Sequence, residues 1–344
     1  MGNTVRVGIA IPLTADVPSV GRLLDELTEE VMAAEAAGLD LVMVPEHHQG
    51  PTIGYASPLT VATLLAAQTE TIKIATGVLV LPAYHPLHVA EAVTMLDHIS
   101  GGRFVLGVGA GYQPVDLEPF GVALPTRPAA MEESLEALRL LLTKDVAAYA
   151  GHHVAFGPVR LRPRPLTEPA PAVWLGSWSP AGVRRAARLC DGWIADPIRT
   201  VTEVAGMAAA YRSGACDAGT PAGTVVVMRE AWLDDSDAAA RRNFAAVIEP
   251  VFDYYRRRGA GARAHNNFDE LAADRFVLGD ADQCAAMVWE VSRRTGADVV
   301  TLHLRHPGGP SHSETLARIR ALGEALSSGP GHRSNNLADE RGRS

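Results

Sequence analysis

Apolar and polar positions alternate with two different periods along the chain. Short apolar runs of strand length are followed by longer segments in which apolar residues recur with the period of a helix. This order is typical of βα units stacked around a parallel sheet. Eight apolar runs are predicted strands, and they span Val5 to Pro12, Leu39 to Pro45, Ile72 to Leu81, Phe104 to Val108, Ala172 to Gly176, Gly192 to Ala195, Thr224 to Trp232 and Asp298 to Leu304.

Helical patterns follow these strands. They cover about Val20 to Ala37, Pro58 to Glu70, Pro86 to Ser100, Ala129 to Lys144, Pro180 to Cys190, Val201 to Asp217, Ser236 to Arg258 and Ser313 to Leu326, with an additional helix at Asp282 to Thr295. Eight such units fit a (β/α)8 TIM barrel better than a doubly wound sheet with a second domain. We expect one domain over residues 1–328 and a disordered tail over residues 329–344, which has no apolar period.

Two connections are longer than ordinary loops. Residues 145–171 contain a turn-like segment and a return rich in proline and arginine, which predicts an excursion hairpin outside the barrel. Residues 256–276 are rich in arginine and contain glycine, and we interpret them as a flexible connection and a candidate lid loop.

Composition and charge exclude several classes of protein. The chain is 47% hydrophobic and 20% charged, which suits a packed globular protein, and it has no apolar run near the ~20 residues that cross a bilayer. Its net charge is −8 and no dense basic stretch contains aromatics, so we expect no nucleic-acid partner and no membrane. The sequence enters a strand at Val5 without a signal-peptide pattern, and the three cysteines form no C-x-x-C motif. We therefore expect a cytoplasmic protein.

The second predicted strand ends in the triplet Glu46-His47-His48. In a barrel of this type the reacting groups lie where strands end, so this triplet is the first candidate for chemistry. The histidines could bind a metal, act as a general acid or base, or form a structural hydrogen-bonded pair. Because neighbouring side chains at a strand end point in opposite directions, at most one histidine faces the interior, and we expect no metal.

Three further strand ends carry candidate residues. His85 precedes Pro86 and is either a helix cap or a functional residue. The segment 107–111 alternates glycines, which either let a flat ligand approach the backbone or pack against a bulky neighbour. It is not a dinucleotide fingerprint, because its spacing is G-x-G-x-G and Pro114 follows. Ser177 and Ser179 open a helix, where they could hold a phosphate or simply cap the helix.

Several of these segments match one family pattern. They are Glu46-His47-His48, Thr76 to Pro82 with His85-Pro86, Leu96 to Arg103, Gly107 to Tyr112, Phe120 to Val122, Gly176 to Ser179 and Ala187 to Trp193. Together they resemble the bacterial luciferase-like flavin-dependent monooxygenase family, over about residues 5–326. This resemblance implies a (β/α)8 fold that binds FMN, or in sister branches the deazaflavin F420, at the carboxyl ends of the strands.

The resemblance also assigns residues. It implies that His47 is catalytic, and that the cofactor is contacted by Leu81, Pro82, Ala83, Tyr84, Gly109, Ala110, Gly176, Ser177, Trp178 and Ser179. The segment 81–84 would line the isoalloxazine, and the two serines match the phosphate-binding segment. Ala110 stands where family members commonly have an arginine that holds the phosphate, although Arg184 and Arg185 could supply charge instead.

The function implied by the resemblance is that of a flavin-dependent monooxygenase. Such an enzyme uses reduced FMN and O2 to oxygenate a small organic substrate, and it receives the reduced flavin from a separate flavin reductase. The glutamate-histidine-histidine triplet favours FMN over F420. We also expect a homodimer. The alternatives are an F420-dependent oxidoreductase that transfers hydride, and a flavin-binding protein without catalytic activity.

Overall fold

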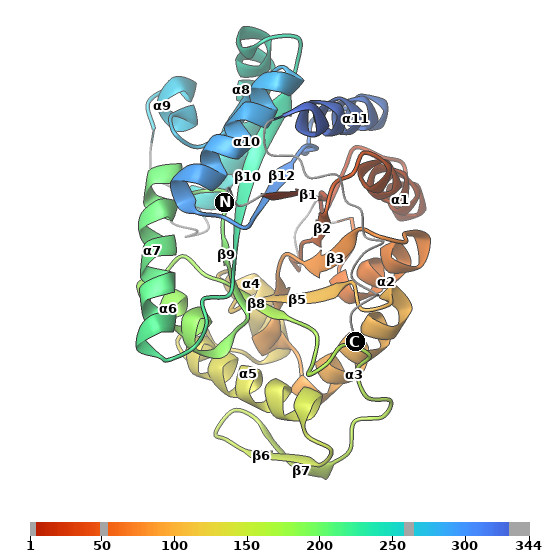
Figure 1. The fold of residues 1–344 in the computed structure, drawn as a ribbon, viewed down its shortest axis with the longest axis vertical. Helices are drawn as coiled ribbons and strands as arrows, with labels where there is room; N and C mark the ends of the chain where they lie inside the picture. Colours follow the sequence, from red (N-terminus) through yellow and green to blue (C-terminus); the bar gives the residue numbers. More distant parts are fainter. Residues whose placement is uncertain (1–4, 49–53, 258–264, 330–344) are drawn as a thin grey trace, which may run out of the picture.

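A computed structural model describes residues 5–48, 54–257 and 265–329 of the chain. Within these residues, eight parallel strands follow one another around a closed barrel, because the last strands pair back with the first and with each other. The predicted (β/α)8 barrel is thus confirmed (Figure 1). In barrel order the strands are β1 (Arg6–Ala10), β2 (Leu41–Val44), β3 (Lys73–Thr76), β5 (Phe104–Gly109), β8 (Val173–Gly176), β9 (Gly192–Ala195), β10 (Thr224–Leu233) and β12 (Val299–His303).

Helices form a ring around the outside of these strands (Figure 1). The long ones are α1 (Val20–Ala36), α2 (Pro58–Gln68), α3 (Pro86–Ser100), α5 (Arg127–Thr143), α6 (Pro180–Leu189), α7 (Val201–Asp217), α8 (Asp237–Arg257), α10 (Ala281–Thr295) and α11 (His312–Ser328). Their bounds agree with the predicted helices to within a few residues. No helix of the described part of the chain has the length and apolar character needed to cross a membrane.

The third predicted strand differs from its prediction. In place of one strand from Ile72 to Leu81, the chain forms β3, a break at Gly77-Val78, β4 (Leu79–Val80) and a 3-10 turn, η1 (Leu81–Ala83). A side chain at Gly77 would meet the side chain of Met43 at 2.9 Å, and β4 then pairs with β5. The break therefore lets β4 lie against β5 at the mouth of the barrel, where sequence periodicity shows only a continuous apolar run.

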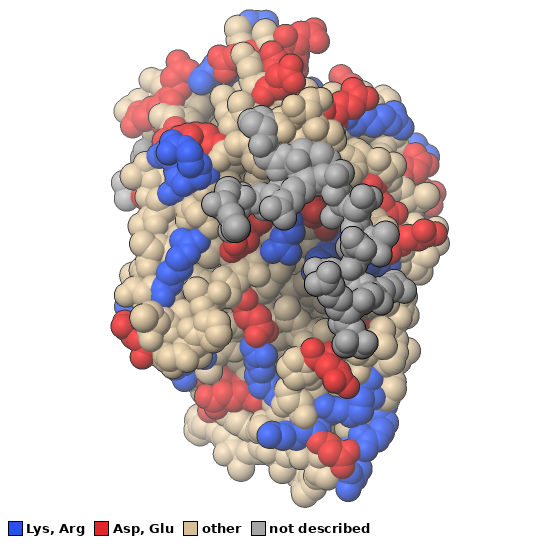
Figure 2. Space-filling model, viewed as in Figure 1, with Lys and Arg blue, Asp and Glu red and all other residues tan. Residues whose placement is uncertain are grey.

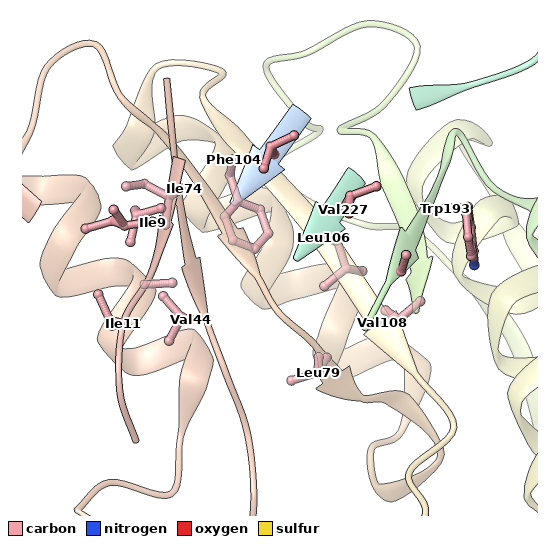
Figure 3. Packing of buried hydrophobic residues seen from close by; sticks show 14 of the residues in the cluster. Ile9, Ile11, Val44, Ile74, Leu79, Phe104, Leu106, Val108, Trp193 and Val227 are labelled. Atoms are coloured by element: carbon pink, nitrogen blue, oxygen red, sulfur yellow. The ribbon is translucent and has the colours of Figure 1, made fainter. Parts of the chain in front are cut away.

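The core has two apolar layers because strand residues alternate in direction. One cluster of buried side chains fills the inside of the barrel, and it includes Leu41, Met43, Trp174 and Met228. The alternate residues pack outward under the helices. Figure 3 shows part of this outer layer, with labelled side chains such as Ile9, Val44, Leu106, Val108 and Trp193. The inside of the barrel is thus filled, and only its carboxyl-end layer is available to a ligand.

The predicted excursion forms a two-stranded hairpin, β6 (Ala147–Ala150) and β7 (Ala155–Val159). Glu133 of α5 fastens its turn by accepting hydrogen bonds from the backbone N–H groups of His153 at 2.6 Å and Val154 at 3.0 Å. The hairpin extends from the barrel wall (Figure 1). It is confirmed as a structure outside the barrel.

The candidate lid and the tail are only partly described. Residues 258–264 of the connection 256–276 lie outside the described residues, whereas α9 (Phe268–Ala272) and β11 (Val277–Gly279) are ordered elements beside β10. Sequence reasoning missed β11. Residues 330–344 also lie outside the described part, so the tail and the single domain over 1–328 stay predictions.

On the face shown in Figure 2, acidic and basic side chains are interspersed.

Candidate active site

The carboxyl end of β2 carries the first candidate, His47. Its side chain is 30% exposed, and its Nδ1 donates a hydrogen bond of 2.9 Å to Oδ2 of Asp116. Asp116 belongs to α4 (Pro114–Leu117), a short helix directly after β5, and is 1% exposed. Because a carboxylate only accepts hydrogen bonds, it fixes the proton on Nδ1. Within the described part of the chain, no group is hydrogen-bonded to Nε2 of His47.

Asp116 also fixes the backbone that carries His47. Its second oxygen, Oδ1, accepts a hydrogen bond of 2.7 Å from the backbone N–H of His48. One buried carboxylate therefore sets both the position of the loop and the orientation of the imidazole, as supporting groups of catalytic histidines commonly do. Sequence reasoning did not single out Asp116. The signal was present, because Asp116 lies within the family-like stretch between Tyr112 and Phe120.

Glu46 and His48 form a second, separate hydrogen-bond system. Glu46 is 4% exposed and accepts hydrogen bonds from Nε2 of His48 at 2.6 Å, the backbone N–H of Val80 at 2.5 Å and the hydroxyl of Tyr84 at 2.5 Å. The hydrogen bond to Glu46 raises the pKa of His48, against the effect of burial. Burial, and then Glu46, raises the pKa of Tyr84. This system anchors the loop after β2 to the segment after β4.

Aromatic and amide side chains surround His47. The ring of Tyr112 meets it edge-on at 5.7 Å between centroids, and Trp178 meets Tyr112 at 5.5 Å. Nε2 of Gln113 lies 3.4 Å from Nδ1 of His47 and donates to the Tyr112 hydroxyl at 3.1 Å. The hydroxyl of Tyr254, from the end of α8, donates to Oε1 of Gln113 at 3.1 Å. These side chains give the mouth of the barrel an apolar wall with a few polar groups, the usual character of a small-molecule site.

The segment predicted to line a flavin ring has mixed exposure. Leu81 is fully buried in the core under the helices, so only its backbone is available to a ligand. Pro82, Ala83 and Tyr84 are half-buried at the surface of the mouth. His85, which follows them, is the N-cap of α3, and its Nδ1 accepts a hydrogen bond from the backbone N–H of Leu87 at 3.2 Å. The cap interpretation of His85 accounts for that residue.

The glycines at the ends of β5 and β8 are explained by packing. A side chain at Gly109 would meet Cγ2 of Val78 at 2.5 Å, and one at Gly176 would meet Cγ1 of Val78 at 3.0 Å. The bulky neighbour expected from the sequence is present, since Val78 lies over both glycines, and the approach of a flat ligand to this backbone stays a prediction. Ala110, next to Gly109, is half-buried and packs against the core.

The serine segment lies at the start of α6. Ser179 is its N-cap and accepts a hydrogen bond from the backbone N–H of Gly182 at 3.1 Å, and Ser177 accepts one from the N–H of Ser179 at 3.3 Å. A side chain at Gly182 would collide with Ser177, so the first turn of the helix is bare. Capping is therefore present, and two exposed hydroxyls remain at a helix N-terminus, where anions bind well.

An unpredicted residue places a positive charge beside Trp178 of this segment. The guanidinium of Arg199, in the loop after β9, lies 5.4 Å from the centre of the Trp178 ring, and its Nη1 is 3.4 Å from Asp196. Arg185, by contrast, donates to Glu132 of α5 at 3.0 Å and so points away from the serines. Arg184 is exposed. No sequence motif marks Arg199, because only the barrel brings the loop after β9 beside the end of β8.

Comparison with known protein families agrees with this geometry. The model of the luciferase-like monooxygenases matches residues 5–298. The chain belongs to this family. The family is one of oxidoreductases, and the resemblance in the sequence is confirmed.

Members of the family differ in cofactor. The chain is 32% identical over 180 residues to the F420-dependent glucose-6-phosphate dehydrogenase of Nakamurella multipartita, covering 49% of this chain and 51% of that protein. The alignments with the curated relatives span about half of their length. The names of known relatives mention F420 in one case and FMN in another.

Solved structures share the fold over nearly the whole chain. Monooxygenase RslO1 from Streptomyces bottropensis superposes with a TM-score of 0.83 at 24% identity, covering 94% of this chain and 98% of that one. The oxygenating constituent of 3,6-diketocamphane monooxygenase from Pseudomonas putida, solved with FMN, has a TM-score of 0.77 at 20% identity over 94% and 98% of the two chains. At these identities the likeness concerns the fold.

Proposed function

We propose that this protein is a monooxygenase that uses reduced FMN and O2 to oxygenate a small organic substrate at the carboxyl end of the barrel. The observation that carries the proposal is the arrangement of the His47 imidazole. Its Nδ1 is held by a buried carboxylate, and its Nε2 is open at a mouth walled by aromatic rings. A positioned histidine of this kind accelerates proton transfer by roughly 10²- to 10⁴-fold.

The residues at the mouth fit a flavin mononucleotide. Ser177 and Ser179 with the bare first turn of α6 would hold the phosphate, and Arg199 would supply the charge that Ala110 lacks. Pro82, Ala83 and Tyr84 would border the ring system, with the backbone at Leu81, Gly109, Ala110 and Gly176 and the ring of Trp178 beside it. When bound, reduced FMN supplies the electrons that activate O2.

The chain's own side chains then have defined tasks. His47 holds or donates a proton at Nε2, while Asp116 stabilises the charged imidazole and keeps its orientation. Tyr112 and Trp178 would shield the bound cofactor and the substrate from bulk water.

We further propose that a separate flavin reductase supplies the reduced FMN. No G-x-G-x-x-G follows any predicted strand of the sequence, and the family resembled here typically receives its flavin already reduced. To test this, the protein is mixed with NADH or NADPH and FMN without oxygen, and the oxidised-flavin absorbance is followed. We expect no bleaching until a reductase is added. Bleaching at a catalytic rate by the protein alone would refute the two-component arrangement.

The cofactor itself is tested by binding. Reduced FMN and reduced F420 are titrated anaerobically into the protein, and we expect tighter binding of FMN. Arg199→Gln should lower the affinity for FMN by about tenfold or more and the affinity for riboflavin only slightly, because only FMN carries the phosphate. The control variant Arg184→Gln should bind both flavins with the affinity of the wild type. Tighter binding of F420 would instead favour the alternative, a hydride-transferring F420-dependent oxidoreductase, for which the F420-dependent relative is the supporting observation.

The homodimer also stays a proposal. Sedimentation or light scattering of the purified protein measures its mass in solution directly, and a mass of one chain would contradict it.

A further inference from the structure

A second pair of ionisable side chains lies at the mouth of the barrel, on strands that the family-like motifs do not include. Glu230 of β10 and His303 of β12 are direct register partners at the carboxyl ends of two neighbouring parallel strands. Val226 and Met228 on β10 and Val299 on β12 fill the inside of the barrel. Because strand residues alternate, Glu230 and His303 also face inward, in the layer above these apolar side chains.

The geometry of the pair is that of a histidine with a supporting carboxylate. Nδ1 of His303 donates a hydrogen bond of 3.0 Å to Oε2 of Glu230, whose side chain is 2% exposed. The side chain of His303 is 20% exposed. Among the described residues, no group forms a hydrogen bond with its Nε2. The carboxylate therefore fixes the proton on Nδ1, and Nε2 is the ring nitrogen available to a ligand.

The surrounding charges make His303 the group that gains a proton. Burial disfavours a charge on it, but Glu230 outweighs burial and raises the pKa of His303. His306, whose Nδ1 is 3.5 Å from Glu230, has its pKa lowered, first by burial, and its Nε2 donates to the carbonyl of Ala231 at 3.3 Å. Burial also opposes ionisation of Glu230, yet the attraction of His303 lowers the pKa of that carboxyl. Arg229 and Tyr255 also interact electrostatically with Glu230, and Asp196 acts in turn on Arg229 and Tyr255.

This pair shares the mouth with His47. Tyr254 hydrogen-bonds to Gln113 beside His47, and the next residue of α8, Tyr255, has its pKa raised by burial and then by the charges of Glu230 and Tyr112. The end of α8 thus connects the two clusters.

We propose that Nε2 of His303 accepts the proton of a weakly acidic hydroxyl group on the substrate, a phenol or an enol, and that Glu230 is the positioning residue. The O–H bond of the substrate breaks with its electron pair left on oxygen, and the proton forms an N–H bond on the imidazole. The step involves no oxidation. It yields a phenolate or enolate, whose carbon is a better nucleophile toward an electrophilic oxygen; this last use rests on the proposed function.

The substrate class follows from matching acidities. Carboxylic acids have a pKa of about 4 and need no base at neutral pH, and aliphatic alcohols are too weak to lose a proton to imidazole. Phenols, with a pKa of about 10 in tyrosine, lie within the range that a positioned histidine with a charged partner can ionise. The partner matters because Glu230 stabilises the imidazolium that forms, as the aspartate does in a Ser-His-Asp triad.

The experiment uses para-nitrophenol, whose phenolate absorbs at longer wavelength than the phenol, bound to the full-length protein without any flavin. In the wild type we expect the ionisation midpoint of the bound probe to fall by about one pH unit, which means about tenfold tighter binding of the phenolate. His303→Gln should remove the shift, Glu230→Gln should reduce it, and the control His88→Gln, at a histidine whose side chain is 82% exposed, should leave it in place. Imidazole added to His303→Ala should restore it, which a purely structural histidine would not permit.

Three results would overturn this inference. They are no binding by the wild type up to millimolar probe, binding without a shift of the midpoint, and a shift that survives His303→Gln but is lost in His47→Gln. Because the assay contains neither flavin nor reductant, its outcome is independent of whether the protein oxygenates anything. A protein that shifts the probe but consumes no O2 with reduced FMN would refute the proposed function alone.

Discussion

Oδ2 of Asp116 lies 2.9 Å from Nδ1 of His47, although the two residues come from the ends of different barrel strands. The carboxylate is almost completely buried, whereas the imidazole is partly open to the mouth. This relationship distinguishes His47 from its neighbour His48, whose ring is turned toward Glu46. Of the two neighbouring histidines, His47 has the more exposed side chain, at 30% against 8% for His48.

Asp116→Asn should lower turnover strongly without unfolding the protein. The amide keeps the size of the side chain but can present its NH2 group to the imidazole, which favours the wrong tautomer; the same change in a serine protease triad costs about 10⁴-fold. We expect a loss of at least about 10²-fold in kcat, similar to His47→Ala, with little change in KM. Steady-state kinetics with reduced FMN measure it.

Glu118→Gln is the matched control for Asp116→Asn, since Glu118 is exposed in the same segment. It should leave kcat unchanged. Turnover of Asp116→Asn or His47→Ala within about threefold of the wild type would remove the pair from the mechanism.

The double variant Ser177→Ala, Ser179→Ala should weaken the binding of FMN much more than the binding of riboflavin. Both hydroxyls are at the bare first turn of α6, and only FMN presents a phosphate to them. Loss of the N-cap should also lower the free energy of unfolding by about 1 kcal/mol. Fluorescence titrations with the two flavins measure the affinities.

Ser311→Ala controls for the cap, because Ser311 caps α11 in the same way far from the serine segment. It should cost similar stability and leave both affinities unchanged. An equal loss of affinity for FMN and for riboflavin in the double variant would mean that the phosphate binds elsewhere.

The sequence was sufficient for the barrel and insufficient for much of the site. Hydrophobic periodicity and turn residues locate the strands and helices, because the buried face of each one is encoded in its own residues. His47 could be found because it directly follows such a strand. Asp116, Arg199 and Glu230 could not be found in this way, since each acts on a residue from another strand end. Only closure of the barrel brings these pairs together.

The break after β3 shows a different limit. Apolar periodicity predicts one strand over Ile72 to Leu81, because apolar residues run almost without interruption there. Whether such a run stays straight depends on its neighbour, here the side chain of Met43 and the edge of β5.

Gly109→Ala should be destabilising, and Val78→Ala should relieve part of the effect. The added methyl group would lie 2.5 Å from Cγ2 of Val78, a β-branched side chain with little freedom to move. We expect a loss of about 1 to 3 kcal/mol in the single variant and a favourable coupling in the double variant, measured by urea unfolding.

Gly157→Ala, in the hairpin strand β7, is the control for added bulk, since nothing lies near its position. It should be close to neutral. Additive effects of Gly109→Ala and Val78→Ala would show that Val78 does not occupy the space over Gly109.

Stability should depend on pH through His312 of α11. Its ring donates to Glu30 at 3.0 Å and to Glu29 at 2.8 Å on α1, and these bonds raise the pKa of His312 although burial opposes the charge. A group with a raised pKa stabilises the folded state fully below its unfolded pKa and loses this contribution as pH rises through the folded value. His312→Gln should therefore cost about 1 kcal/mol at about pH 6 and little at about pH 9.

Urea unfolding of both proteins at the two pH values measures this dependence. His88→Gln is the control, because His88 is an exposed histidine, with a side chain 82% exposed. It should show no pH-dependent difference. A cost for His312→Gln that is larger at high pH would contradict the assignment of charge to His312.

The most direct measurement of the proposed oxygenation follows the oxygen atom itself. The protein is given chemically reduced FMN, isotopically labelled dioxygen and a panel of phenols and enolisable ketones, and the products are analysed by mass spectrometry. We expect one labelled oxygen atom in the product of at least one compound, strongly reduced with His47→Ala. No label in any product, together with substrate oxidation and F420 reduction in a parallel assay that contains oxidised F420 in place of reduced FMN, would contradict a monooxygenase and establish hydride transfer.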